Sequence, residues 1–243
     1  KIIDDYSITC FSSVPSILKI ATSFGEPPKR RTLEKIYSAS APLDSLTWNN
    51  TFKWSSGISV NNMYGMTELA SWITGNQKNL SAGFQENAFD IPWGAEVKIV
   101  KENPSDLVGE IVVSASSLMS GYFNDYESTK KILVDGWFKT GDAGELTQTQ
   151  LLLKGRIDDM MNLGGQKIYP EEINQVIRMH PKVLDCYTIG LKNSAAEAEF
   201  GIGSIVIVKE NQKVNVSDIQ SFCKEHLSSY KIPSQVRLLE SMP

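Results

Sequence analysis

The sequence has few of the residues that build metal and disulfide frameworks: two histidines and three cysteines among 243 residues. The cysteines, at positions 10, 186 and 223, are odd in number and far apart, and no Cys-x-x-Cys pair occurs. These spacings argue against a Cys/His zinc site and against a disulfide framework. A reduced, cytoplasmic setting is therefore the expectation.

Long apolar runs and an excess of basic residues are also missing. No uncharged apolar run approaches the roughly 20 residues that a membrane helix needs, and the N-terminal residues lack signal-peptide or transit-peptide character. The 28 acidic and 24 basic residues give a net charge of −4 without a Lys/Arg stripe, which argues against a nucleic-acid partner. With 41% hydrophobic and 21% charged residues, the composition is that of a globular protein with one or two domains.

Residues 1–75 alternate between strand and helix signals. We expect strands at 7–11, at 33–37 and from 58, with helices that begin at Pro15 and run from about 44 to 54. This alternation predicts parallel βαβ units. Because ligands bind at the carboxyl ends of parallel strands, the loops expected at 38–42 and 62–68 form the first candidate site.

The rest of the sequence divides into two regions with different secondary-structure signals. Residues 90–155 contain short apolar runs between turn residues, which predicts an antiparallel meander or small barrel. Residues 156–243 predict a small α+β unit, with a helix between Pro170 and Pro181 and a second helix opened by a Ser217–Gln220 capping box. Its strands are expected at 183–189, 202–208 and 235–239.

Three motifs carry polar residues suited to chemistry. Tyr64-Gly65-Met66-Thr67-Glu68 offers a flat ring, a phosphate-binding hydroxyl and a hard oxygen ligand for Mg²⁺, although a turn before a Thr-capped helix would have the same pattern. Gly136–Asp142 ends in a carboxylate suited to two ribose hydroxyls or to a plain hairpin turn. Gly155–Ile173 combines Arg156 with paired Asp and Gly residues, as a flexible joint or a solvated linker would.

The order of these motifs resembles that of the AMP-forming adenylate ligases, which include acyl-CoA synthetases, peptide-synthetase adenylation domains and beetle luciferases. The resemblance covers essentially the whole chain. It rests on the three motifs above together with Gly109-Glu110-Ile111, Gly121-Tyr122 and Tyr230-Lys231-Ile232-Pro233. It implies the end of a parallel α/β subdomain, an antiparallel β subdomain and a small α+β C-terminal domain. The implied boundaries are 1–156 for the large domain (1–88 α/β, 89–156 β-rich) and 157–243 for the small mobile one.

The resemblance also implies an activity and its residues. A carboxylic acid attacks the α-phosphate of ATP, and a thiol of CoA or of carrier-protein phosphopantetheine then displaces AMP. Tyr64 would stack on adenine, Thr67 would contact phosphate, Glu68 would help hold Mg²⁺, and Asp142 would bind the ribose with Arg156 nearby. Asp158 would be the hinge. The remaining implied positions are Ala39, Ser40, Asn62, Met63, Gly65 and Met66 for the nucleotide, and Gly164, Gly165 and Lys167 for the thiol.

Some features of the family are not found in this sequence. No Gly/Ser/Thr-rich phosphate loop ending in Lys precedes Tyr64, and Ala39 and Ser40 stand where the family has two glycines. Pro243 matches the proline that opens the segment with the family's catalytic Lys. We therefore expect a C-terminal portion of an acid–thiol ligase that is inactive by itself. The alternatives are an adenylation domain that loads a carrier protein and a nucleotide-binding module without catalysis; the acid itself is not predicted.

Overall fold

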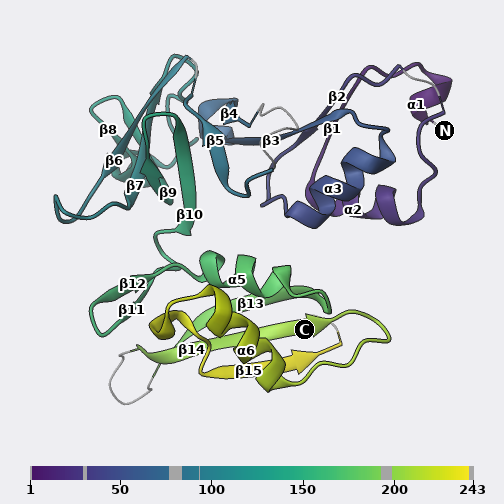
Figure 1. Ribbon diagram of the computed structural model, residues 1–243. Helices are drawn as coiled ribbons and strands as arrows, with labels where there is room; N and C mark the ends of the chain where they lie inside the picture. Colours follow the sequence, from purple (N-terminus) through teal and green to yellow (C-terminus); the bar gives the residue numbers. More distant parts are fainter. Residues whose placement is uncertain (1, 30–31, 77–83, 93, 193–198, 241–243) are drawn as a thin grey trace. The chain divides into compact units, whose positions relative to one another are not determined.

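The computed structural model describes residues 2–29, 32–76, 84–92, 94–192 and 199–240 (Figure 1). The chain forms two compact units. The first unit comprises Lys1–Thr140 and Gly144–Leu153, and the second comprises Gly141–Ala143 and Lys154–Pro243. Each is described by itself below.

A four-stranded sheet with the order β1-β2-β3-β4 begins the first unit. The elements follow the chain as α1 (Ile2–Asp5), β1 (Cys10–Ser13), α2 (Pro15–Phe24), β2 (Lys35–Ser38), α3 (Ser45–Trp54), β3 (Ser59–Met66) and β4 (Ser71–Gly75). The pairs β1–β2 and β2–β3 are parallel, which confirms the predicted βαβ alternation. Pro15 lies in the first turn of α2, and Asp44 caps α3 by accepting a 2.7 Å hydrogen bond from the Thr47 N–H.

The loop expected at 62–68 is mostly strand, so that prediction was wrong. β3 pairs in parallel with β2 as far as Asn62 and then continues in antiparallel pairing with β4, from Met63 opposite Gly75 to Met66 opposite Ser71. Pairing with β4 supplies hydrogen-bond partners for the β3 backbone beyond the end of β2, so β3 continues as a strand. The first strand also differs, because it begins at Cys10 rather than at residue 7.

The rest of the first unit is built on a sheet with the order β5-β10-β9-β7-β6, and β8 pairs with β9. Its strands are β5 (Ala88–Asp90), β6 (Ala95–Val100), β7 (Gly109–Ala115), β8 (Leu133–Val134), β9 (Trp137–Leu146) and β10 (Gln150–Arg156). β6, β7, β9 and β10 are neighbours in meander order, and only β5, from earlier in the chain, departs from it by pairing with β10.

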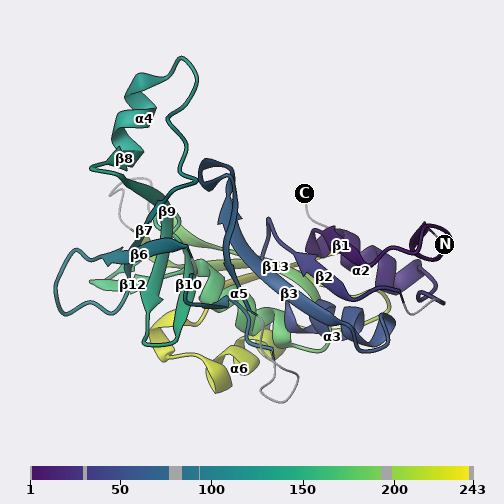
Figure 2. The same ribbon diagram turned by 90° about the horizontal axis from the view of Figure 1, so that it is seen from above.

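Residues 90–155 are also not all β. Helix α4 (Tyr126–Ile132) begins at Asp125, which accepts a 3.0 Å hydrogen bond from the Ser128 N–H. Figure 2 shows α4 and β8 together, beyond one end of β9. The Asp125 carboxylate stabilises this helix, which the strand-rich pattern of residues 90–155 does not predict.

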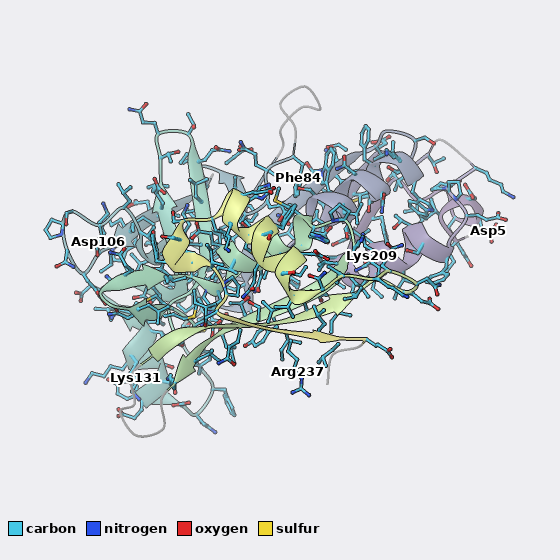
Figure 3. All side chains as sticks on the ribbon, turned by 60° about the horizontal axis from the view of Figure 1, so that its bottom comes forward. Asp5, Phe84, Asp106, Lys131, Lys209 and Arg237 are labelled. Atoms are coloured by element: carbon cyan, nitrogen blue, oxygen red, sulfur yellow. The ribbon has the colours of Figure 1, made fainter. Side chains whose placement is uncertain are left out.

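The second unit is a three-stranded sheet with the order β13-β14-β15, preceded by a hairpin. Its elements are β11 (Met161–Leu163), β12 (Gln166–Ile168), α5 (Pro170–Met179), β13 (Val183–Lys192), β14 (Glu199–Val208), α6 (Val216–His226), a 3₁₀ turn (Ser229–Lys231) and β15 (Gln235–Leu239). Helix α5 packs on β13 and α6 on β15, and the two helices contact each other. Figure 3 shows Arg237 of β15 pointing away from the side of the sheet on which α6 lies.

The start of α6 differs from the sequence prediction. Asn215, not Ser217, is the N-cap, and it forms a capping box with Asp218. Asn caps as well as Ser does, and the Asp218 carboxylate accepts from the Asn215 N–H at 3.0 Å. Gln220 instead donates to the Pro233 carbonyl at 3.0 Å.

Across the described parts of the chain, no helix combines the length and the apolar character that crossing a bilayer requires.

Candidate functional site

The candidate segments of the first unit begin side by side on the parallel sheet. Ser38, the last residue of β2, is the register partner of Asn62 on β3. Beyond it, Ala39 is buried and Ser40 is exposed with a φ of +71°, a left-handed conformation that favours glycine. The Ser38 hydroxyl is buried and has no hydrogen-bond partner among the described residues. The sequence thus correctly predicted that these two segments meet at one edge of the sheet.

Asn62 marks the point where β3 exchanges one partner for another. Its N–H donates to Asn76 Oδ1 and its carbonyl accepts from the Asn76 N–H, both at 2.9 Å. The register shifts between Tyr64 and Gly65, and such irregularities redirect the side chains of a strand. Gly65 is required here, because a Cβ atom would lie 2.2 Å from the Ser71 carbonyl oxygen.

Tyr64 is largely buried, with 8% of its surface exposed. Its ring packs against Phe89 with the centroids 5.5 Å apart and the planes tilted by 37°. Met63 and Met66, on either side, are half-buried. Only a small part of the Tyr64 ring is therefore accessible to a base.

Thr67 and Glu68 lie in a 3₁₀ turn (Thr67–Leu69) directly after β3. Thr67 is exposed and Glu68 is half-buried. The Glu68 carboxylate accepts a 2.7 Å hydrogen bond from the Tyr122 hydroxyl, and the Glu68 carbonyl accepts one from the Met119 N–H at 2.8 Å. The hydrogen bond to Glu68, followed by burial and the nearby negative charge, raises the pKa of Tyr122. The hydroxyl therefore remains a donor at neutral pH.

Asp142 and Arg156 lie together in the second unit. Arg156 Nη1 is 3.0 Å from Asp142 Oδ1, with the Asp142 side chain 12% exposed and that of Arg156 50% exposed. Gly141 has a φ of +70°, and a Cβ atom there would lie 2.6 Å from Arg156 Nη2. The Ile157 N–H donates to the Gly141 carbonyl at 2.8 Å. The guanidinium thus lies over a glycine that leaves room for it, and it neutralises the neighbouring carboxylate.

The remaining predicted residues also lie in the second unit. Asp158 is exposed in the turn after β10. Gly164 and Gly165 form the two-residue turn of the β11–β12 hairpin, with φ values of +60° and +84°, as two-residue hairpin turns require. Lys167 pairs with Asn162 across this hairpin, and Asn162 Oδ1 accepts from the Gly165 N–H at 3.0 Å. Pro243 lies outside the described residues.

The ion pairs of α5 are not predicted by the sequence analysis, and two of them involve acidic residues of its first turn. Lys231 Nζ lies 2.6 and 2.7 Å from the two carboxylate oxygens of Glu172, which joins the Tyr-Lys-x-Pro segment to the first turn of α5. Arg178 pairs with Glu171 on the same helix. Glu171 and Arg178 are seven residues apart, about two turns of a helix, and this spacing is a local sign of their pairing. Glu172 and Lys231 are 59 residues apart, and no local spacing indicates that pair.

The described residues contain no group of three or more His, Cys, Asp or Glu side chains able to hold a metal ion. Mg²⁺ does not need such a group, since it is commonly bound by one or two carboxylates together with substrate phosphates. Glu68 fits that kind of binding because it is half-buried and one of its oxygens is held by a neutral hydroxyl. Any Mg²⁺ at this position would therefore take further ligands from phosphate oxygens and water.

Comparison with known proteins gives matches in both halves of the chain. Residues 1–123 match the model of the AMP-binding enzyme family, and residues 172–243 match that of the AMP-binding enzyme C-terminal domain. Among curated proteins, a probable CoA ligase of Humulus lupulus (CCL9) is 30% identical over 97% of this chain and 46% of its own length. An oxalate–CoA ligase of Arabidopsis thaliana is 30% identical over 98% of this chain and 47% of its own length.

A solved structure is similar as well. The o-succinylbenzoate CoA synthetase of Bacillus subtilis, in complex with ATP and a magnesium ion, is 26% identical, with a TM-score of 0.80 over 99% of this chain and 50% of that one. The chain thus spans about half the length of the relatives that it matches. The similarity extends over both the mixed α/β first unit and the α+β second unit, which agrees with the fold class predicted from the sequence.

Proposed function

The chain belongs to the family of AMP-binding enzymes, and from this premise we propose that it is the C-terminal portion of an ATP-dependent, AMP-forming carboxylic acid:thiol ligase of the acyl-CoA synthetase type. In the first step, an oxygen of the acid's carboxylate attacks the α-phosphorus of ATP, and pyrophosphate leaves with the electron pair of the broken P–O bond. In the second, a thiol such as that of CoA loses its proton and attacks the acyl carbon, and AMP leaves. The products are a thioester, AMP and pyrophosphate.

In this proposal the segments that follow the parallel ends of β2 and β3 bind the base and phosphates of the nucleotide. The backbone of Ala39, Ser40 and Asn62–Met66 borders the adenine, Tyr64 contacts it with the accessible part of its ring, and Thr67 donates its hydroxyl to a phosphate oxygen. Support comes from the common origin of the two segments at the paired positions Ser38 and Asn62. Parallel sheets bind ligands at this end of their strands.

Glu68 is the residue proposed to hold Mg²⁺ on the phosphates. Bound there, the ion supplies neutralisation of the charge on the phosphate oxygens. Glu68 contributes a carboxylate that accepts a hydrogen bond from the Tyr122 hydroxyl, and a neutral donor leaves the negative charge in place. This arrangement of Glu68 is the single observation on which the catalytic proposal depends.

The remaining roles, at the ribose and in the thiol step, are proposed for Asp142, Asp158 and the β11–β12 hairpin. Asp142 accepts hydrogen bonds from the ribose hydroxyls, with its orientation set by Arg156. We propose Asp158 as the hinge between domains with the boundary at 156/157, and the turn Gly164–Gly165 with Lys167 as the part that approaches the thiol. A backbone without side chains at the hairpin turn allows the close approach of a ligand, and Lys167 supplies a positive charge for the phosphates of CoA.

Acid-dependent exchange of pyrophosphate into ATP tests the proposal, because it reports the first step alone. The protein encoded by the complete reading frame is incubated with ATP, Mg²⁺ and a panel of acids that includes oxalate and 2-succinylbenzoate, the acids named for its relatives. The expected result is exchange with at least one acid, and AMP release when CoA is added. If AMP is released only with a carrier protein that bears phosphopantetheine, that carrier protein is the acceptor in place of CoA. Binding of ATP without exchange for any acid would contradict the ligase assignment.

The 243-residue chain serves as the matched comparison. It carries no Gly/Ser/Thr-rich phosphate loop before Tyr64, so we expect it to show no exchange by itself; robust exchange would show that the chain needs no further elements. We also propose a cytoplasmic location, on the grounds that Cys10, Cys186 and Cys223 are all unpaired and that thiols persist in reducing compartments.

A further inference from the structure

We propose that Tyr122 is a positioning residue for the adenylation step, and that its hydroxyl sets the orientation in which the Glu68 carboxylate meets Mg²⁺ and the phosphates of ATP. The proposal deepens the proposed function and rests on the role of Glu68 given there. It starts from one contact: the Tyr122 hydroxyl donates to Glu68 Oε1 at 2.7 Å, across 54 residues of sequence.

The backbone that carries Tyr122 is held by local interactions. Gly121 has a φ of +148°, and a Cβ atom there would lie 2.8 Å from the Thr129 methyl group. The Tyr122 N–H donates to Thr129 Oγ1 at 2.8 Å, and that hydroxyl donates to the Asp125 carbonyl at 2.7 Å. Asp125 is in turn the N-cap of α4. Because each of these atoms has a defined partner, the start of α4 fixes the point from which the Tyr122 ring extends.

The segment before Tyr122 holds the backbone of the turn that contains Glu68. The Met119 N–H donates to the Glu68 carbonyl at 2.8 Å, and the Ser117 hydroxyl donates to the Leu69 carbonyl at 2.9 Å. Residues 117–122 therefore bind both the main chain and the side chain of the same short turn. These two contacts bind the main chain of the turn, whereas the Tyr122 hydroxyl binds the Glu68 carboxylate. The contact from Tyr122 therefore acts on the direction of the carboxylate.

A tyrosine is chemically suited to this task. An ionised carboxylate accepts about four hydrogen bonds or metal contacts in total, and the Tyr122 hydroxyl takes one of them on Oε1. A lysine or arginine at the same place would fix the carboxylate equally well, but its positive charge would compete with a metal ion. A neutral donor orients the ligand and preserves its charge, in the way that partners of metal-binding carboxylates commonly do.

Replacement of Tyr122 by Phe tests the proposal, because it removes only the hydroxyl. In the protein of the complete reading frame, Y122F is expected to raise the Mg²⁺ concentration for half-maximal pyrophosphate exchange about fivefold to tenfold, the effect of losing one hydrogen bond of ordinary net strength. The KM for the acid should stay the same. The control is Y126F, which removes a hydroxyl from a tyrosine of α4 that is 72% exposed, and it should leave the Mg²⁺ dependence unchanged.

Thr129 allows a second test, in which Tyr122 itself is intact. T129V keeps the shape of the side chain but removes the oxygen that binds the Tyr122 N–H, so it should shift the Mg²⁺ dependence in the same direction by about twofold to threefold. T129S keeps the hydroxyl and should restore the wild-type value. A residue with only a structural role would lower stability without changing the Mg²⁺ dependence.

Thermal unfolding of the 243-residue chain tests the contact independently of any activity. If the hydroxyl binds Glu68, Y122F should lower the melting temperature in the wild-type background and have no further effect in an E68A background. Equal shifts in both backgrounds would overturn the contact. An active wild-type protein in which Y122F and Y126F have the same Mg²⁺ dependence would overturn the positioning role alone. If the wild-type protein shows no exchange, the proposed function is overturned, and so is the positioning role of Tyr122 that rests on it.

Discussion

Two carboxylates of this chain, one in each unit, are held by opposite kinds of partner. Glu68 accepts a hydrogen bond from a neutral phenol, at 2.7 Å from the Tyr122 hydroxyl. Asp142 pairs with a guanidinium, at 3.0 Å from Arg156 Nη1. Both side chains are thereby oriented, but among the described residues only Asp142, of the two, has a positively charged partner.

The difference separates two chemical tasks. A carboxylate beside a guanidinium carries little net charge as a pair, and what it offers a ligand is hydrogen-bond acceptors, which suits the neutral hydroxyls of a sugar. A carboxylate held by a phenol keeps its charge and suits a cation. The local partners thus support the assignment of Glu68 to Mg²⁺ and of Asp142 to the ribose, and substitutions at each position test that assignment.

The largest effect is expected from Glu68→Gln, which removes the charge but keeps an oxygen for the Tyr122 hydroxyl. In the protein of the complete reading frame, pyrophosphate exchange should fall by about 10²- to 10³-fold, the usual effect of losing one group that stabilises transition-state charge. Glu127→Gln, an exposed position on α4, is the control. If E68Q retained normal exchange and normal Mg²⁺ dependence, the charge of Glu68 would have no catalytic role, and the comparison of the two carboxylates would lose its basis.

The second largest effect is expected from Asp142→Asn. The amide keeps the shape of the carboxylate but accepts with one oxygen only, so the KM for ATP should rise by about 10- to 100-fold, with a smaller change in kcat. Steady-state exchange at varied ATP measures this, with exposed Asp159→Asn as the control. An unchanged discrimination between ATP and 2′-deoxy-ATP relative to wild type would contradict the contact with the ribose.

The sequence predicted the parts of this architecture that depend on neighbouring residues. Pro15 and Asp44 correctly mark the starts of α2 and α3, and the alternation of strand and helix signals identified the parallel sheet. The resemblance of the motifs identified Glu68 and Asp142 as candidates. Each of these inferences used signals that lie within a few positions of the residue concerned.

The parts that sequence reasoning missed depend on distant partners or on a choice between equivalent local signals. β3 continues beyond Asn62 because β4 pairs with it, and no property of residues 62–66 alone predicts that partner. The Ser217–Gln220 spacing predicts a capping box, but the helix is capped by Asn215 with Asp218. Asn and Ser are equally good caps, so this local pattern does not distinguish them. The contact between Tyr122 and Glu68 spans 54 residues, so only the folded chain brings it to light.

A third carboxylate, Glu172, adds a case in which a cation contacts both oxygens. Lys231→Met should remove this pairing with Glu172 and lower the stability of the second unit by about 1 kcal/mol, a modest value because the Glu172 side chain is 44% exposed. Thermal unfolding of the chain should show a decrease of a few degrees. The matched control is Lys224→Met at an exposed position of α6. Equal melting temperatures for the two variants would mean that the pair is not stabilising.

The smallest effect is expected from Arg156→Lys, which keeps the positive charge beside Asp142 but replaces the planar fork with a single ammonium group. If neutralisation by charge is the main contribution of Arg156, the KM for ATP should rise only about twofold to threefold, far less than in D142N. If geometry dominates, the rise should approach that of D142N, because Gly141 leaves room for the planar guanidinium in particular. Arg237→Lys, on the exposed part of β15, is the control for the substitution itself. A large effect of R156K would therefore replace the charge argument with one based on shape, and the contrast between the two carboxylates would rest on Glu68 alone.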